Sequence, residues 1–439
     1  MSDRKSLLIL FSQRSWQALS GLVSLILITK FLSPTDQGWY FTFSSFAALY
    51  TLFDFGLSTT LIQISSHLFA KVQWGSNGLP VGKNSRNIIC FIRQSASIYF
   101  KISLIFFIVI LPLGILLFRS NSNSISPNNY NWLPPWIFLA FATSLNFMTL
   151  PFTSILEGSG RTKEIFSLRL INNLIGSILS WVLLILGFNL LAVASMSITS
   201  AIVTFYWLIN SQKELVKSSF KKRDKIFNWR TEVWPMQWKL GITSTTWFLS
   251  SQIYVPILFY FQGAIIAGQL GVTLTIINMI GVLSQSWVSH QIPAMGKAAA
   301  LKNWEVFDTL FLYNFLKSIA FYLAGITILA GVYLIWLPND FKARFLLLNG
   351  ILGVCAIVFF NQLIWAITCQ LRSFKKEPFV WITISSLFMT LPLAIFSAYK
   401  YSTNEVILSI LAIQVIFTVP LSINSWRQEN KKLRLTHHE

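Results

Sequence analysis

Long apolar stretches follow one another along almost the whole chain, separated by short polar segments. Twelve of these stretches are long enough to cross a bilayer, for which about 20 apolar residues suffice. A lipid-embedded chain must satisfy its backbone polar groups internally, so each stretch is predicted to be a helix. We expect these helices near 7–32, 38–64, 95–118, 132–156, 165–187, 190–210, 236–261, 264–289, 307–337, 343–369, 378–399 and 404–424. The pattern indicates an all-α polytopic membrane protein.

The pattern of the first half recurs in the second. A shift of 230 residues places the first expected helix on the seventh, and Gly38 then meets Gly268. Parallel repeats of six plus six helices place a substrate path at their interface. We therefore expect two six-helix bundles related by an internal repeat. The expected parts are a first bundle at 1–210, a basic cytoplasmic linker at 211–235, a second bundle at 236–424 and a basic cytoplasmic tail at 425–439.

Composition supports the membrane interpretation. The chain is 54% hydrophobic and only 11% charged, whereas soluble domains carry about 25% charged residues. With the N-terminus inside, 25 Lys and Arg residues lie in or beside the inner segments and 4 in the outer ones. This asymmetry follows the positive-inside rule and predicts cytoplasmic N- and C-termini. The net charge of +19 is then a property of the inner loops and indicates no nucleic-acid partner.

The first two expected helices form a hairpin, joined by a five-residue polar turn at 33–37, and both carry charges. Arg14 is expected about 11 Å above the inner face and Asp54 about 15 Å above it, at 1.5 Å per residue. The two side chains are therefore close enough in depth to meet. One interpretation is a structural ion pair, because buried charges are paired as a rule. The other is that Arg14 faces a cavity and attracts a phosphate, while Asp54 tunes it or takes up a coupling cation.

Three lysines add positive charge within the spans. Lys101 and Lys317 occupy equivalent places in the third and ninth expected helices, about two turns in. Lys239 lies nearer the inner end of the seventh. A lysine near a helix end usually extends to the lipid headgroups. The equivalent placement of Lys101 and Lys317 favours a cavity position, so we group all three with Arg14 as candidate substrate-binding cations.

Polar side chains also recur at helical spacing in three helices, which places each set on one face. Stripes of this kind line a wet cavity or simply pack helices together. The repeat relates the first helix to the seventh, and polar stripes on both favour a cavity. The stripes comprise Gln13, Gln17, Ser20 and Ser24 in the first helix, Thr243, Thr246 and Ser250 in the seventh, and Thr275, Asn278 and Gln285 in the eighth.

No segment carries the residues of a catalytic site. The sequence has no Gly-rich phosphate loop, no triad pattern and no paired carboxylates within one segment. Its three cysteines are too scattered for a metal site or a disulfide framework. The outer loops are short, so none holds an enzymatic domain. We expect neither an enzyme nor a metal site.

Four segments carry a resemblance to a known family. The run 31–49 (FLSPTDQGWYFTFSSFAAL), followed by 53–58 (FDFGLS), resembles the start of Wzx-type O-antigen and polysaccharide flippases. The run 156–161 (LEGSGR) resembles the inner turn after the family's fourth helix. The run 267–273 (AGQLGVT), with Pro293 beyond it, resembles the counterpart in the second half. The family belongs to the multidrug/oligosaccharidyl-lipid/polysaccharide (MOP) exporter superfamily.

This resemblance implies a MATE-like fold and alternating access. It also implies a bacterial inner-membrane protein that moves an oligosaccharide linked to undecaprenyl pyrophosphate, alongside membrane lipids and other glycan-assembly membrane proteins. It implies no cofactor, and it leaves H⁺ or Na⁺ open as the coupling ion. The alternative is a cation-coupled multidrug or small-molecule exporter of the same fold. An exporter of organic cations needs acidic residues in its cavity, and Asp54 is the only one placed well inside an expected span.

Overall fold

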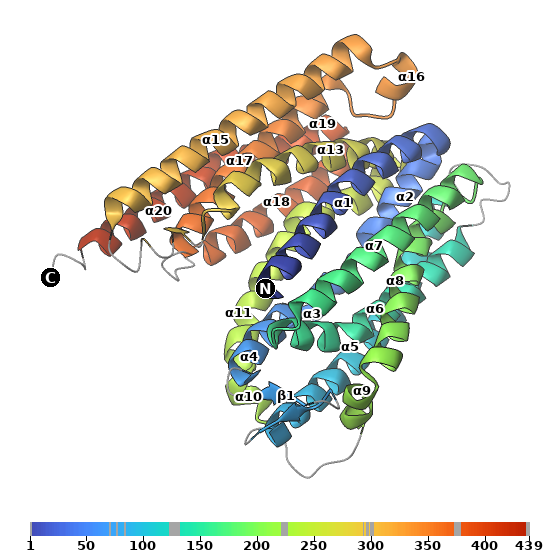
Figure 1. Ribbon diagram of the computed structural model, residues 1–439. Helices are drawn as coiled ribbons and strands as arrows, with labels where there is room; N and C mark the ends of the chain where they lie inside the picture. The colour runs from blue at the N-terminus through green and yellow to red at the C-terminus, as the bar shows by residue number, and fades with distance from the viewer. Residues whose placement is uncertain are drawn as a thin grey trace. The chain divides into compact units, whose positions relative to one another are not determined.

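The protein is described by a computed structural model that covers residues 2–69, 72–75, 78–82, 85–122, 132–220, 227–292, 294–295, 298, 303–372 and 379–435. Helices account for nearly all of these residues (Figure 1). The chain divides into two compact units, Met1–Ile253 (unit 1) and Tyr254–Glu439 (unit 2). Each unit is described below by itself.

Unit 1 is built around a layer of long helices. In this layer α1 packs on α7, α7 on α8, α8 on α6, and α6 on α5, while α4 also packs on α6. The two short strands pair antiparallel, with Gln73 opposite Val81. The elements are α1 (Ser2–Phe31), α2 (Pro34–Ala47), α3 (Tyr50–Asp54), α4 (Leu57–Phe69), β1 (Gln73–Trp74), β2 (Pro80–Val81), α5 (Ser85–Ser122), α6 (Leu133–Gly158), α7 (Thr162–Ile185), α8 (Leu191–Ser211), α9 (Lys213–Phe220), α10 (Trp229–Glu232) and α11 (Trp234–Gln252).

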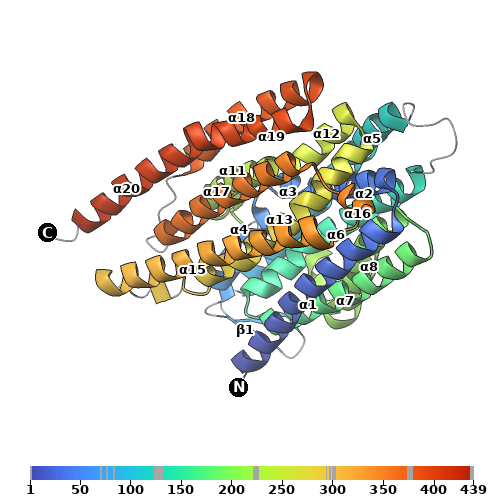
Figure 2. The same ribbon diagram turned by 90° about the horizontal axis from the view of Figure 1, so that it is seen from above.

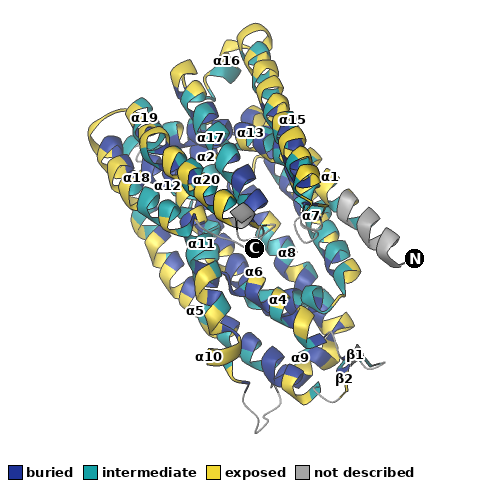
Figure 3. Cartoon of the chain, turned by 90° about the vertical axis from the view of Figure 1, so that its left-hand side faces the viewer, coloured by how far each residue is buried: buried dark blue, intermediate teal, exposed yellow. Residues whose placement is uncertain are grey.

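Unit 2 is organised around α13, which packs on α12, α15 and α17, while α18 and α19 pack on each other (Figure 2). One side of α15 is exposed along most of its length (Figure 3), as expected for a helix that faces lipid. The elements are α12 (Tyr254–Gln262), α13 (Ala264–Ser289), α15 (Trp304–Gly331), the π-helix η1 (Val332–Trp336), α16 (Asn339–Lys342), α17 (Leu348–Arg372), α18 (Val380–Lys400), α19 (Thr403–Ile413), the π-helix η2 (Gln414–Thr418) and α20 (Val419–Leu435).

Helices occur at all twelve expected spans. Nine described helices are long and apolar enough to cross a membrane, and the bent pair Pro34–Asp54 and Leu57–Phe69 makes a tenth. At the other two expected spans lie α1, which carries Arg14, and α11 followed by α12. The chain is therefore a multi-pass, all-helical membrane protein.

The connection between α1 and α2 is shorter than the polar turn expected at 33–37, so that prediction was wrong. α1 ends at Phe31 and α2 already begins at Pro34. The hydroxyl of Ser33 accepts a hydrogen bond from the backbone N–H of Asp36 at 3.0 Å, which is an N-cap. Proline suits the first helical position because the missing N–H has no partner there in any case. The polar residues therefore start a helix, and the connection is shorter than expected.

The expected linker and tail are mostly helical where the structure describes them. The segment 211–235 contains α9, α10 and the start of α11, and its residues 221–226 lie outside the described part. α20 continues through the expected tail as far as Leu435. The compact units meet at 253–254, within the seventh expected span. The division into two bundles at 211–235 stays a prediction.

An aromatic cluster fills one end of unit 1. Phe118 of α5 lies 5.0 Å from Trp136 of α6 and 4.8 Å from Phe43 of α2, measured between ring centroids. Gly114 permits this packing, because a Cβ there would lie 2.2 Å from a ring carbon of Trp136. The Trp136 indole donates to the Leu111 carbonyl at 3.1 Å, so its one polar group is satisfied. This cluster fixes α2, α5 and α6 together above the bend described next.

Candidate functional site: a buried carboxylate at a helix break

The second expected span is bent, and the bend lies directly after Asp54. The axes of Pro34–Asp54 and Leu57–Phe69 differ by 48°. Phe55 has φ 44° and Gly56 has φ 68°, a left-handed conformation that breaks the helical hydrogen-bond ladder. Among the described residues, Phe55 is the only non-glycine with a positive φ. Backbone of this kind is costly, and it is found preferentially at functional sites.

Helix α11 packs against the bend at van der Waals distance. A Cβ on Gly56 would lie 2.7 Å from the carbonyl carbon of Leu240 and 2.8 Å from the nitrogen of Gly241. A Cβ on Gly241 would in turn lie 2.3 Å from two ring carbons of Phe55. Each glycine leaves room for the other segment, so the bend and α11 interlock.

Neutral donors hold the Asp54 carboxylate. The Tyr99 hydroxyl of α5 donates to Oδ1 at 2.6 Å, and the Ser58 hydroxyl donates to Oδ2 at 2.7 Å. The Ser58 backbone N–H donates to both oxygens at 3.3 Å. Because Ser58 lies in the first turn of α4, the carboxylate sits at the positive end of that helix dipole. The break itself creates this second helix N-terminus within the span.

The surroundings of Asp54 are apolar. The side chain is only 6% exposed. The ring of Phe147 lies 5.4 Å from that of Tyr99 and 5.9 Å from that of Tyr50. Within the described part of the chain, Asp54 forms no ion pair. A buried carboxylate held only by neutral donors becomes neutral when it takes up a cation. A carboxylate already paired with a basic side chain takes up a cation less readily.

Arg14 does not pair with Asp54. Its side chain is exposed on α1, whereas Asp54 is buried against α5 and α4. The structural ion pair considered from the sequence is therefore not formed in this structure. Compatible depth along two helices did not determine which way the side chains point. The substrate-binding role of Arg14 stays a prediction.

The three candidate lysines lie in different environments. Lys101 is exposed on α5, and Lys239 is exposed on α11 with its Nζ 5.9 Å from the Trp238 ring centroid. Lys317 is half-buried on α15, where its Nζ lies 4.1 Å from the ring centroid of Tyr313 and 5.0 Å from another ring. None of the three forms an ion pair with a described carboxylate. Their proposed action on a common substrate stays a prediction.

The polar stripe of α1 partly packs within unit 1. The Trp181 indole donates to Ser24 at 2.8 Å, and Ser20 is buried and donates to the Gln17 carbonyl at 3.2 Å. Gln17 is exposed and Gln13 half-buried. The bond at Ser24 thus attaches α1 to α7, and the bond at Ser20 stays within α1. Polar residues in membrane helices often have such packing roles.

The stripes of the seventh and eighth expected helices are likewise mixed. Thr246 is buried, Thr243 is half-buried and Ser250 is exposed on α11. On α13, Thr275 donates to the Gly271 carbonyl at 2.7 Å, while Asn278 is exposed and Gln285 half-buried. A cavity shared by these stripes stays a prediction.

Unit 2 has a polar cluster at the position that matches Asp54. The repeat shift of 230 residues maps Asp54 onto Ser284 of α13. Ser284 is fully buried, and its hydroxyl donates to the Ser318 carbonyl of α15 at 2.6 Å. Gln362 of α17 donates to Ser284 and also to the Ser318 hydroxyl at 2.7 Å. The two units therefore place a buried polar contact at the same point of the repeat, but only unit 1 puts a titratable group there.

Sequence reasoning missed Tyr99 as the partner of Asp54. The two residues are 45 positions apart, and Tyr99 lies in an apolar run that gives no sign of a polar contact. The available signal was Asp54 itself, because a carboxylate inside a span requires a partner. The identity of that partner depends on how α5 packs, which the pattern does not encode.

Solved structures of membrane transporters share this fold. No protein-family model and no curated protein matches the sequence. An inward-facing multidrug resistance MATE family transporter of the MOP superfamily aligns with a TM-score of 0.64 and 15% identity, over 98% of this chain and 99% of that one. The MATE multidrug transporter DinF-BH, solved as a complex, aligns at 0.60 and 12% identity, over 97% and 94%. A MOP superfamily transporter from Pyrococcus furiosus, described as having a binding pocket of reverse polarity, aligns at 0.54 and 14% identity, over 98% and 95%.

The chain has the two-lobe MATE fold. Near-complete coverage of both chains means that the architecture is shared from end to end. The expected fold class is therefore confirmed. Identities of 12–15% extend this likeness to the fold alone.

Proposed function

We propose that this protein is a secondary transporter that moves an anionic substrate across a membrane and couples this movement to cation uptake at Asp54. The observation that supports it best is the Asp54 carboxylate, buried at the break of a membrane helix and held by Tyr99 and Ser58 without a basic partner among the described residues. Ionisable groups inside membrane helices mark ion and substrate pathways. The MATE fold supports the general class.

The position of Asp54 explains how cation uptake would change the structure. The carboxylate accepts the hydrogen bond of Tyr99 and caps the N-terminus of α4. A proton or Na⁺ on the carboxylate removes one of these acceptor oxygens and weakens the attraction to the helix dipole. Both effects act next to Phe55 and Gly56, where the backbone is already strained. Cation uptake would therefore favour a different bend angle.

The charges in the spans favour an anionic cargo. Arg14, Lys101, Lys239 and Lys317 form no ion pair with a described carboxylate. A cavity for organic cations needs the opposite balance. The first candidate cargo is an oligosaccharide on undecaprenyl pyrophosphate, in keeping with the resemblance of the N-terminal hairpin to polysaccharide flippases. Such a protein works in the bacterial inner membrane, beside other glycan-assembly proteins.

The test of this cargo is complementation in a bacterium that lacks its own O-antigen flippase. Arg14→Ala is expected to abolish surface glycan, because a guanidinium suits a pyrophosphate better than any other side chain, while the protein stays in the membrane. Lys30→Ala is the matched control, since Lys30 is also exposed on α1 but lies in its last turn, with its Nζ 5.6 Å from the Phe31 ring centroid. Normal surface glycan in the Arg14 variant would contradict the proposed role.

A second candidate function is the export of small molecules. The likeness to solved multidrug transporters supports it. This function predicts that the wild-type chain protects a drug-sensitive host from a cationic dye such as ethidium and lowers accumulation of the dye in the cells. Protection without glycan complementation would replace the first candidate by the second.

The coupling role of Asp54 is tested separately from the cargo. Asp54→Asn keeps an oxygen that accepts from Tyr99, but it cannot take up a proton at physiological pH. We expect the variant to fold and reach the membrane and to lose transport of whichever cargo the wild type moves. Transport at the wild-type rate would exclude Asp54 as the coupling site.

A further inference from the structure

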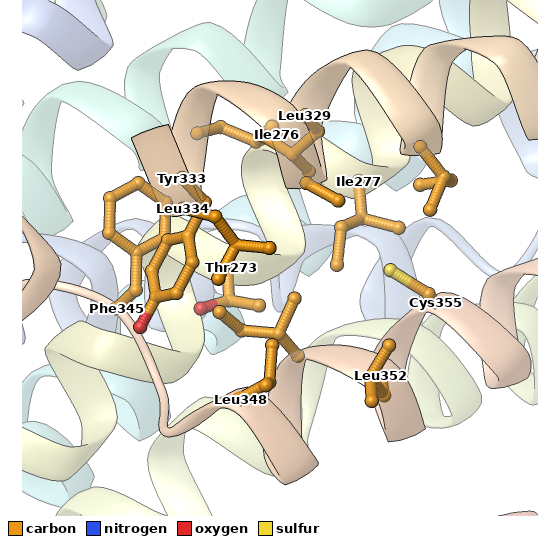
Figure 4. Close-up of a pocket in the computed structure, with 13 residues that line it drawn as sticks. Thr273, Ile276, Ile277, Leu329, Tyr333, Leu334, Phe345, Leu348, Leu352 and Cys355 are labelled. Atoms are coloured by element: carbon orange, nitrogen blue, oxygen red, sulfur yellow. The ribbon is translucent and has the colours of Figure 1, made fainter. Parts of the chain in front are cut away.

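Unit 2 contains an apolar pocket at the end where α16 lies. It is enclosed by α13, α15, η1 and α17 and has an empty volume of about 490 Å³, counting the space at its open mouth (Figure 4). Ile277, Leu329, Tyr333 and Leu352 are among its lining side chains.

Two polar side chains beside the pocket, Gln269 and Thr273, are already engaged in hydrogen bonds within the protein. The Thr273 hydroxyl donates to the Gln269 carbonyl at 2.7 Å and accepts from the Leu346 N–H at 3.2 Å. The Gln269 amide donates to the Ala343 carbonyl at 2.9 Å. These bonds attach the loop between α16 and α17 to α13, so the pocket is formed before any ligand arrives. Its interior accordingly suits a hydrocarbon chain.

The mouth of the pocket carries a cation. Lys342 Nζ donates to the Leu334 carbonyl at 3.2 Å and lies 5.8 Å from the Tyr333 ring centroid, and both residues line the pocket. An ammonium has three donors, so two are left for a ligand. The segment 338–347, which comprises α16 and the loop after it, holds Asp340, Lys342 and Arg344 and has a net charge of +1.

The rim of the pocket is exposed and apolar. Leu334, which lines the pocket, is 59% exposed, and Trp336, two residues further along η1, is 82% exposed. Tryptophan at a helix end is typical of the membrane–water boundary, so the mouth lies at headgroup level and a chain can enter from the lipid side. The π-helix η1 carries both residues, and π-helices occur frequently at functional sites.

We propose that this pocket binds one anionic phospholipid, with an acyl chain in the pocket and the phosphate at Lys342. Lipid tails are as apolar as the lining residues, so the chain alone gives little preference over bulk lipid. The charge at the mouth therefore sets the selectivity. This site is separate from Asp54 and does not depend on the nature of the cargo.

Native mass spectrometry of the purified full-length chain tests the proposal, with phosphatidylglycerol and phosphatidylcholine as probes. We expect the wild type to retain one phosphatidylglycerol in preference to phosphatidylcholine. Lys342→Gln is expected to weaken phosphatidylglycerol binding about fivefold, the effect of one basic residue near an anionic lipid surface. Ala330→Phe fills the pocket from α15 and is expected to abolish the bound lipid.

Two control variants make the test specific. Lys400→Gln removes another lysine that lies beside aromatic rings at a helix end, 5.5 Å from the Tyr401 ring centroid, but away from this pocket. Ala320→Phe enlarges an exposed residue of α15 that does not line the pocket. Equal effects of Lys342→Gln and Lys400→Gln, or unchanged binding by Ala330→Phe, would overturn the proposal.

Discussion

Gly56→Ala probes the interlock between the helix break and α11. Two costs add at this position. The left-handed backbone, with φ 68°, costs an alanine roughly 1–2 kcal/mol. The new methyl group would also lie 2.7–2.9 Å from atoms of Leu240 and Gly241, mostly backbone. Overpacking of this kind costs roughly 1–3 kcal/mol. The combined loss is about 2–5 kcal/mol in the free energy of unfolding.

Gly187→Ala separates the two costs. Gly187 has φ 80°, and nothing lies within 4 Å of its would-be Cβ, so only the roughly 1–2 kcal/mol of backbone strain applies. Reversible unfolding in mixed micelles, titrated with a denaturing detergent, measures both variants against the wild type. The Gly56 variant should be the less stable of the two by at least about 1 kcal/mol. Equal stability of the two variants would refute the close packing of α11 on the bend.

Two further substitutions test the buried polar contacts of the two units. Tyr99→Phe removes the hydroxyl that donates to Asp54 and should lower the free energy of unfolding by about 1–3 kcal/mol, because a short buried hydrogen bond to a carboxylate is lost and Oδ1 keeps only the 3.3 Å bond from the Ser58 N–H. A neutral result in the same micelle titration would contradict this contact. Gln362→Leu keeps a similar volume but removes the amide that donates to Ser284 and Ser318. These two hydroxyls still bond to each other, so the free energy of unfolding should fall by at most about 1 kcal/mol. A much larger fall would show that the amide holds the cluster together.

The long periodic segments of the fold were predictable from the sequence, since apolar length alone determines where a chain can cross a bilayer. The details were not. The break after Asp54 depends on Gly56 being in contact with Gly241, which is 185 positions away, and no local pattern shows that contact. The start of α2 was encoded locally, because Ser33 and Pro34 are typical of a helix N-terminus. They were interpreted as a turn because two apolar runs flank them.

The candidate site was predicted only in part. Asp54 stood out because a carboxylate in an apolar run is rare, and the structure places it at the centre of the bend. Of the two interpretations left open for Arg14 and Asp54, the ion pair is not formed in this structure, because depth along a helix says nothing about the direction in which a side chain points. The packing role of Ser24 depends on the Trp181 indole from α7. Such partners are determined by tertiary packing and not by spacing along one helix.

The packing of α11 on the bend has a mechanical consequence. The fulcrum is Gly241, and the helix continues for eleven more residues to Gln252, a lever arm of about 17 Å at 1.5 Å per residue. A tilt of about 10° at the fulcrum would displace the far end by about 3 Å, simply from this length. Only Ile253 separates that end from Tyr254, where unit 2 begins. A change of angle at the contact between Gly56 and Gly241 would thus be amplified along α11 to its last residue, Gln252, next to the end of unit 1.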